Sequence, residues 1–225
     1  MYMKVRTPLP AGKIADYVDR ILIIEHSQVV TPFTLPLYAN GVPNILFLSA
    51  KAQLGKNSSS HLTLFGQTVF PELLTLPDNF TLIAYFLKPY SLIPLFGVSA
   101  LELTDKPLDL HLLFPKQAAA VREKLLNAAT SIEMTALLDD FIFDIITKSK
   151  PVCAMTKYAS SRIAIQPSKE SLVDVQKELH ITERTFQRMF ERNVGLAPNL
   201  YRRICQFNAA FVQLNTGRNQ QRKLS

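Results

Sequence analysis

The first 115 residues alternate between short apolar runs and clusters of turn-forming residues. Eleven of the fourteen prolines fall in this part, and one turn cluster reads Asn40-Gly41-Val42-Pro43. The apolar runs have strand lengths and are rich in β-branched and aromatic residues. We expect strands over 20–26, 34–38, 44–49, 61–66, 73–76 and 80–87. Six or more short strands divided by turns indicate a compact barrel or sandwich.

The run 80–87 is apolar at nearly every position, which is typical of a strand covered on both faces. Pro89 ends this run. A short helix is expected over 90–96, closed by Gly97.

Residues 115–150 have a helical pattern instead. Pro115 begins a stretch rich in Ala, Leu and charged helix formers, and Thr130 with Glu133 forms the capping box of a second helix. Proline at position 151 breaks the pattern, which sets a domain boundary after residue 150. The apolar face of the second helix includes Leu137, Phe141 and Ile145.

The stretch 168–214 has the spacing of a helix, a tight turn, a second helix, a stop and a third helix. Ser168 and Thr182 are suitable N-caps for the first two helices. Gly195 stands where a C-terminal cap requires positive φ, and Pro198 is placed to begin the third helix. Two short helices joined by a tight turn form a helix-turn-helix unit. A further helix over 152–163 is expected to pack behind it.

The second helix of this unit has two faces of different character. Its apolar face consists of Phe186, Met189 and Phe190. Its polar face consists of Arg184, Thr185, Gln187, Arg188 and Arg192. Arg and Gln match the base edges of guanine and adenine in the major groove. An ordinary solvated face is the alternative, but the position on the second helix favours DNA binding.

The positive charge is confined to the same part of the chain. Residues 1–150 hold 13 Lys and Arg against 13 Asp and Glu, whereas residues 151–225 hold 12 against 5. The whole net charge of +7 therefore lies on the segment with the helix-turn-helix. A basic surface limited to one domain is what phosphate neutralisation requires, and a single amphipathic membrane helix fits the pattern less well.

The motif itself is distinctive. It reads Ile181-Thr182-Glu183-Arg184-Thr185-Phe186-Gln187-Arg188-Met189-Phe190, then Val194-Gly195-Leu196, Pro198, Tyr201 and Arg203. This stretch resembles the AraC/XylS family of bacterial transcription regulators, whose pattern is I-S-x-R-x-L-x-R-x-F, G-L-S-P and Y-x-R. The resemblance implies two helix-turn-helix units joined by a long helix. Carried over by position, the base readers are Arg184, Gln187 and Arg188, and the phosphate contacts are Thr182, Arg192 and Arg203.

The chain departs from the family pattern at several points. Gln176 replaces a small residue, Ala197 replaces the usual Ser, and Gln206 replaces a commonly basic position. The sequence ends at Ser225, about where the second motif of the family would begin. We therefore expect residues 151–225 to be the first half of an AraC-type domain. An alternative follows from these departures: a ligand-binding or protein-interaction module whose incomplete helical tail no longer binds DNA.

The N-terminal part carries a weaker resemblance. Its segments RILIIEHS, LPLYANGVPNILFL, LFGQT and YFLKPYSLIPLFGVSALELTDKPLDL are similar to the cupin-like domains that precede AraC-type DNA-binding domains. The resemblance implies an α+β protein with a small cupin-like β-barrel over 1–114, a helical connector over 115–150 and an all-α domain over 151–225. The barrel would sense an unknown small-molecule effector or dimerise. The connector would carry a homodimer contact or merely cap the barrel. The other implied partners are double-stranded DNA and RNA polymerase.

Enzymatic chemistry is poorly represented in the sequence. His26, His61 and His111 are scattered without an H-x-H pair, so we expect no metal, no cofactor and no catalytic residue. Glu25 beside His26 is interpreted as a polar pair at a strand edge, and a cupin-type enzyme would require bound metal. Five aromatic residues either line a ligand cavity or form the core, and the core is favoured: Tyr38, Phe47, Phe65, Tyr85 and Phe86.

The cysteine content and the lack of membrane or signal-peptide patterns lead us to expect a cytoplasmic location. Cys153 and Cys205 are far apart, without metal spacing, and are expected in the core. The sequence has no apolar run of about 18 residues, and its start has no signal-peptide pattern.

Overall fold

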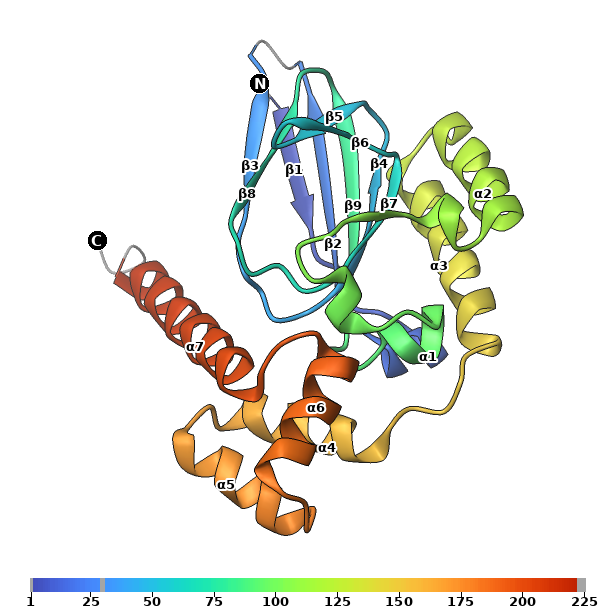
Figure 1. The fold of residues 1–225 in the computed structure, drawn as a ribbon. Helices are drawn as coiled ribbons and strands as arrows, with labels where there is room; N and C mark the ends of the chain where they lie inside the picture. Colours follow the sequence, from blue (N-terminus) through green and yellow to red (C-terminus); the bar gives the residue numbers. More distant parts are fainter. Residues whose placement is uncertain (1, 29–30, 222–225) are drawn as a thin grey trace.

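The computed structural model describes residues 2–28 and 31–221, with a β-rich part followed by helices (Figure 1). The strands are β1 (Tyr2–Arg6), β2 (Val18–Ser27), β3 (Phe33–Leu37), β4 (Asn44–Leu48), β5 (Ala52–Leu54), β6 (Asn57–Ser59), β7 (Leu62–Phe65), β8 (Glu72–Leu76), β9 (Phe80–Leu87) and β10 (Leu108–Asp109). The α-helices are α1 (Leu92–Phe96), α2 (Pro115–Asn127), α3 (Ser131–Thr147), α4 (Ala154–Ile165), α5 (Lys169–Glu178), α6 (Glu183–Val194) and α7 (Pro198–Gln221). Short 3-10 helices are η1 (Gly12–Asp16), η2 (Ala100–Leu103) and η3 (Leu110–Leu112).

The strands form two antiparallel sheets. The larger sheet has the order β1-β2-β9-β4-β7-β10, and the smaller has the order β3-β8-β5-β6. The expectation of a closed barrel is wrong, because no strand ladder joins the two sheets within the described ranges. Strand length and turn spacing predicted the strands but could not decide closure, since closure depends on pairing between residues far apart in the sequence. The α+β class is confirmed.

Strand β9 lies at the centre of the larger sheet and is buried on both faces, as its apolar run predicts. Leu82 and Ala84 belong to the core between the two sheets. Ile83, Tyr85 and Leu87 belong to a second core on the opposite face, together with side chains of α2 and α3. The N-terminal part therefore has three layers: small sheet, large sheet and helices.

Helix α3 covers the outer face of the large sheet. Leu138 and Ile142 are buried there, and the Tyr85 hydroxyl donates to Asp139 Oδ1 at 2.7 Å. Burial raises the pKa of Tyr85, and the Asp139 carboxylate raises it further. Burial also raises the pKa of Asp139. The α2–α3 pair thus caps the sheet, whereas its role in a homodimer stays a prediction.

The capping box predicted for α3 forms with a one-residue difference. Thr130 Oγ1 accepts from the Glu133 backbone N–H at 3.2 Å, as expected. Glu133 Oε2 accepts from the N–H of Ala129 at 3.0 Å, where a capping box would use Thr130.

The C-terminal helices form a third core. Ala159, Ile163, Val175, Phe186 and Phe190 meet there, and α7 extends from it as a long rod (Figure 1). The last four residues of the chain, on which the expectation of a truncated domain rests, lie outside the described residues. None of the helices between residues 2 and 221 combines the length and the apolar character of a membrane span.

Four strands were not predicted from the sequence. They are β1, β5, β6 and β10, which are short or polar. The β5–β6 hairpin turns at Gly55, which has φ +56°. Strands β1, β5 and β10 pair with more distant strands, and the edge strand β6 pairs with the adjacent β5, so their own residues carry little signal.

Tyr85→Phe tests the contact between sheet and connector. The substitution removes a buried hydroxyl that donates to a carboxylate, so we expect the free energy of unfolding to fall by about 1–2 kcal/mol. Chemical denaturation measures this change. Tyr38→Phe is the control, because Tyr38 is 63% exposed and its change should stay within about 0.5 kcal/mol. Equal effects of the two substitutions would contradict the role of the Tyr85–Asp139 bond.

Candidate nucleic-acid interface

Helices α5 and α6 form the predicted helix-turn-helix. The Ser168 hydroxyl accepts from the Ser171 N–H at 3.2 Å, and the Thr182 hydroxyl accepts from the Thr185 N–H at 3.3 Å. Both predicted N-caps are therefore confirmed. The turn between the helices passes through His180, whose φ of +52° lies in the left-handed region. A tight turn of this kind sets the angle between α5 and α6.

Helix α6 buries its apolar face and exposes its basic face. Phe186, Phe190 and Val194 are at most 1% exposed, and Met189 is half-buried. The exposed side chains of the opposite face are Arg184, Thr185, Gln187, Arg188 and Arg192. Gln187 Nε2 donates to Glu191 Oε1 at 3.0 Å, so one of the candidate base readers is held along the helix. The structure thus brings these five side chains onto one surface of the molecule.

The other two candidate residues, Thr182 and Arg203, lie outside α6, just before it and on α7. Their environments differ from those of the α6 side chains. Thr182 is exposed, and its hydroxyl caps α6 and donates to Thr185 Oγ1 at 3.0 Å. Arg203 is exposed on α7. The hydroxyl of Thr182 is therefore already engaged in hydrogen bonds within the protein, whereas Arg203 is an exposed residue.

Sequence reasoning missed the role of Arg202, which is 7% exposed. Its guanidinium donates to Asn199 Oδ1 at 3.0 and 3.2 Å, to the Pro167 carbonyl at 3.3 Å and to Gln206 Oε1 at 3.3 Å. These bonds join the start of α7 to the loop before α5. Gln206, which departs from the family pattern, is thus an acceptor for this clamp. Arg202 and Arg203 are adjacent in the sequence, and nothing in the sequence distinguishes the buried one from the exposed one.

The C-terminal end of α6 contacts the N-terminal part of the chain. Gly195 caps α6 with φ +89°, and a Cβ at this position would lie 2.7 Å from the Ala100 carbonyl oxygen. Thr104 Oγ1 donates to the Gly195 carbonyl at 2.8 Å, and Ser99 Oγ donates to the Arg192 carbonyl at 3.4 Å. The predicted glycine cap is confirmed. It also permits the close approach of the Ala100 carbonyl, which the local sequence did not predict.

The aromatic residues proposed for a cavity divide into two groups. Phe47 and Tyr85 are fully buried in the core. Tyr38, Phe65 and Phe86 line a cavity of about 260 Å³ between the two sheets, where the Arg20 guanidinium carbon lies 4.3 Å from the Phe86 ring centroid. Phe65 is also buried in the core, so the expectation that all five form the core is right for Phe47, Phe65 and Tyr85, whereas Phe86 is only partly buried and Tyr38 is exposed. The cavity combines an apolar body with a cationic rim.

The histidines do not converge. His26 is 4% exposed between the rings of Phe33 and Phe80, and neither ring nitrogen has a hydrogen-bond partner among the described residues. His61 Nδ1 lies 2.7 Å from the Leu48 carbonyl oxygen. No group of three or more His, Cys, Asp or Glu capable of holding a metal occurs in the described part of the chain.

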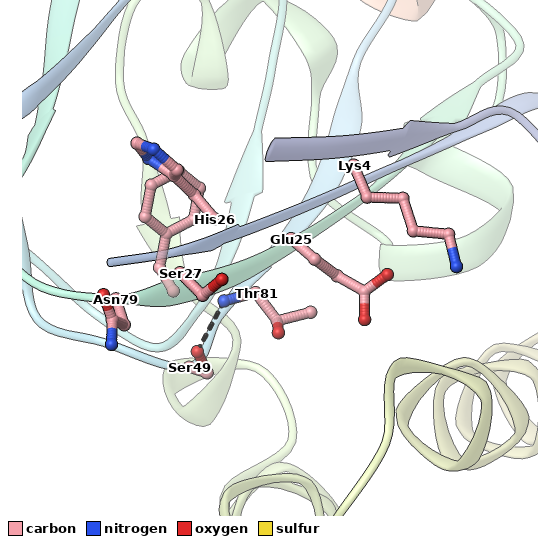
Figure 2. A pocket seen from close by; sticks show the side chains of 8 residues that line it. Lys4, Glu25, His26, Ser27, Ser49, Asn79 and Thr81 are labelled. Carbon is pink, nitrogen blue, oxygen red and sulfur yellow. Dashed lines mark hydrogen bonds between the residues drawn. The ribbon is translucent and has the colours of Figure 1, made fainter. Parts of the chain in front are cut away.

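Glu25 and His26 do not form the polar pair that their adjacency suggested. They point to opposite sides of β2, as Figure 2 shows, because successive side chains alternate along a strand. Glu25 Oε2 instead accepts from Arg6 at 3.3 Å across the β1–β2 ladder. Cys153 and Cys205 are half-buried rather than fully buried, and burial raises the pKa of the Cys205 thiol.

Comparison with known proteins adds one finding. Residues 6–109 match a domain family of unknown function, DUF6597. The matched segment runs from the last residue of β1 to β10, so it contains the two sheets except for most of β1, and it ends before the connector. No curated protein and no solved structure matches the chain. The DUF6597 match assigns this segment no activity.

The turn at His180 gives a test of the helix-turn-helix geometry. A residue other than glycine costs about 1–2 kcal/mol when its backbone lies in the left-handed region. Glycine removes this cost, but it also raises the conformational entropy of the unfolded chain, which offsets part of the gain in stability. His180→Gly should therefore raise the free energy of unfolding by about 0.5–1 kcal/mol, measured by chemical denaturation. His180→Ala is the control because it removes the imidazole but keeps the Cβ. Equal stabilisation by alanine would contradict the explanation from backbone conformation.

Proposed function

We propose that this protein is a sequence-specific DNA-binding regulator in which α6 reads the major groove. The observation that supports this proposal is the division of α6 into a fully buried aromatic face and an exposed face with three arginines. Arg184, Arg188 and Arg192 follow one another at intervals of four residues, so they lie along one side of the helix. Such a row has the length and the charge to follow a groove wall of duplex DNA.

The environment of α6 supports the same function. Residues 151–225 carry the whole excess of positive charge, which is the property required of a surface that contacts DNA phosphates. The caps at Ser168, Thr182 and Gly195 hold two short helices in a fixed relation. Helix α7 is 24 residues long, in keeping with the long helix that the AraC/XylS resemblance implies. In this reading, Arg184, Gln187 and Arg188 read bases, while Arg192 and Arg203 contact phosphates.

Arg188→Ala tests this function. Duplexes are first selected from a random library with the full chain, and binding is then measured at several salt concentrations. The substitution should cost about 1–3 kcal/mol of binding free energy and relax the preference at one base pair. Arg122→Ala is the matched control, since Arg122 is exposed on α2 and carries the same charge. A chain that shows no sequence preference at any salt concentration would leave only the interaction-module alternative.

We propose in addition that the cavity between the sheets binds a small effector with an apolar body and an anionic group. Its walls are apolar, and they include Leu46, Leu74 and Leu82. Arg20 lies at its rim, where it could pair with a carboxylate. Cavities that bind small molecules combine these features: an apolar lining and a few polar groups that fix orientation.

Hexanoate and hexanol make a matched pair of probes for this cavity. Arg20→Gln should weaken hexanoate binding about tenfold, because a charge-assisted hydrogen bond is lost, and should leave hexanol binding unchanged. Calorimetric titration measures both. Arg122→Gln controls for the change in net charge. The proposed effector class would be wrong if both probes failed to bind the wild-type chain, or if both weakened equally.

A further inference from the structure

The groove beside the C-terminal half of α6 belongs to two parts of the chain at once. One wall carries Arg188 and Arg192 of α6, and the other carries Leu101 and Glu102 of η2. The groove has a volume of about 550 Å³. The DNA surface proposed above therefore borders directly on an acidic side chain of the N-terminal part.

We propose that residues 99–104, named here the latch, hold the protein in a form with reduced affinity for DNA. The inference rests on the proposed function of α6 and names its regulation. A phosphate that reached Arg188 or Arg192 through this groove would also approach Glu102, which lines it. The latch must move away before both arginines can be fully used.

Charge is the first argument for the latch. Glu102 is exposed and makes no salt bridge with Arg188 or Arg192 among the described side chains. Its carboxylate therefore remains a free negative charge within the same groove. Two like charges closer than about 10 Å repel each other appreciably at ordinary ionic strength, so Glu102 opposes the approach of a phosphate. Glu191 of α6 also lines the groove and keeps its negative charge while accepting from Gln187, but it belongs to α6 itself and is not part of the latch.

The bonds that hold the latch are the second argument. Thr104 and Ser99 donate to the carbonyl oxygens of Gly195 and Arg192, which lie at the C-terminal end of α6. Gly195 lacks a side chain at the point where the Ala100 carbonyl approaches the helix. A side chain at this position would prevent the contact. The latch is consequently attached to the end of the reading helix rather than merely near it.

The segment that follows the latch connects it to the cavity between the sheets. Asp105 Oδ1 accepts from the backbone N–H groups of Val69 and Phe70 at 2.7 and 3.2 Å. The Asp105 N–H donates to the Gln67 carbonyl at 2.9 Å. Thr68, which lies within this same loop, lines the cavity. A ligand that moves the loop thus has a continuous path of bonded residues to the latch.

Binding of duplex DNA by full-length variants tests the latch. Glu102→Gln keeps the shape of the side chain but removes its charge, and it should tighten binding about three- to tenfold at low salt. The double variant Ser99→Ala, Thr104→Val should also tighten binding, because it removes both side-chain bonds to α6. Glu123→Gln is the matched control: this exposed acid lies on α2, so binding should remain at the wild-type value.

A second readout separates the latch from a general effect of charge. Addition of duplex DNA to the wild-type chain should increase amide hydrogen exchange within residues 99–104. Circular dichroism confirms that each variant is folded. Binding equal to that of Glu123→Gln, or unchanged exchange, would overturn the latch while leaving α6 as the DNA reader. If neither the wild-type chain nor any variant binds duplex DNA, the latch and the proposed function both fail.

Discussion

Burial of strand β9 on both faces is the constraint on which the N-terminal part depends. Ala84 faces the small sheet, and the neighbouring Tyr85 faces α3. Alternation along one strand therefore fills two cores, and a shift of one residue would exchange the contents of both. The Tyr85–Asp139 bond fixes the outer layer against the sheet. The cavity lies on the Ala84 side of β9, whereas the opposite side is buried against α2 and α3.

The elements that the sequence predicted well are those whose signals are local. The caps at Ser168, Thr182 and Gly195, the proline at the start of α7 and the buried stripe of α6 all depend on neighbours within one helical turn. Most strands were likewise predicted because their apolar runs are bounded by turns. The closure of the sheets was not, since pairing between distant strands leaves no trace within either of them.

Residues of the candidate site show the same division. Exposure of Arg184, Gln187 and Arg188 follows from the period of the helix. Burial of Arg202, one residue before the exposed Arg203, does not, because its acceptors lie partly in the loop before α5. The capping role of Gly195 was predicted from its position after the helix. Its approach to Ala100 could not be predicted, because η2 is about 95 residues away in the sequence.

Helix α6 is therefore under two requirements that meet at its C-terminal end. A reading helix needs its arginines free, and a helix that fixes the position of an attached domain needs its end covered. The first turns satisfy the first requirement, with Arg184 in solvent. The last turn satisfies the second, through Gly195 and the carbonyl of Arg192. Arg188 and Arg192 stand where the two requirements overlap, so a movement of η2 would change the surface that we propose α6 presents to DNA.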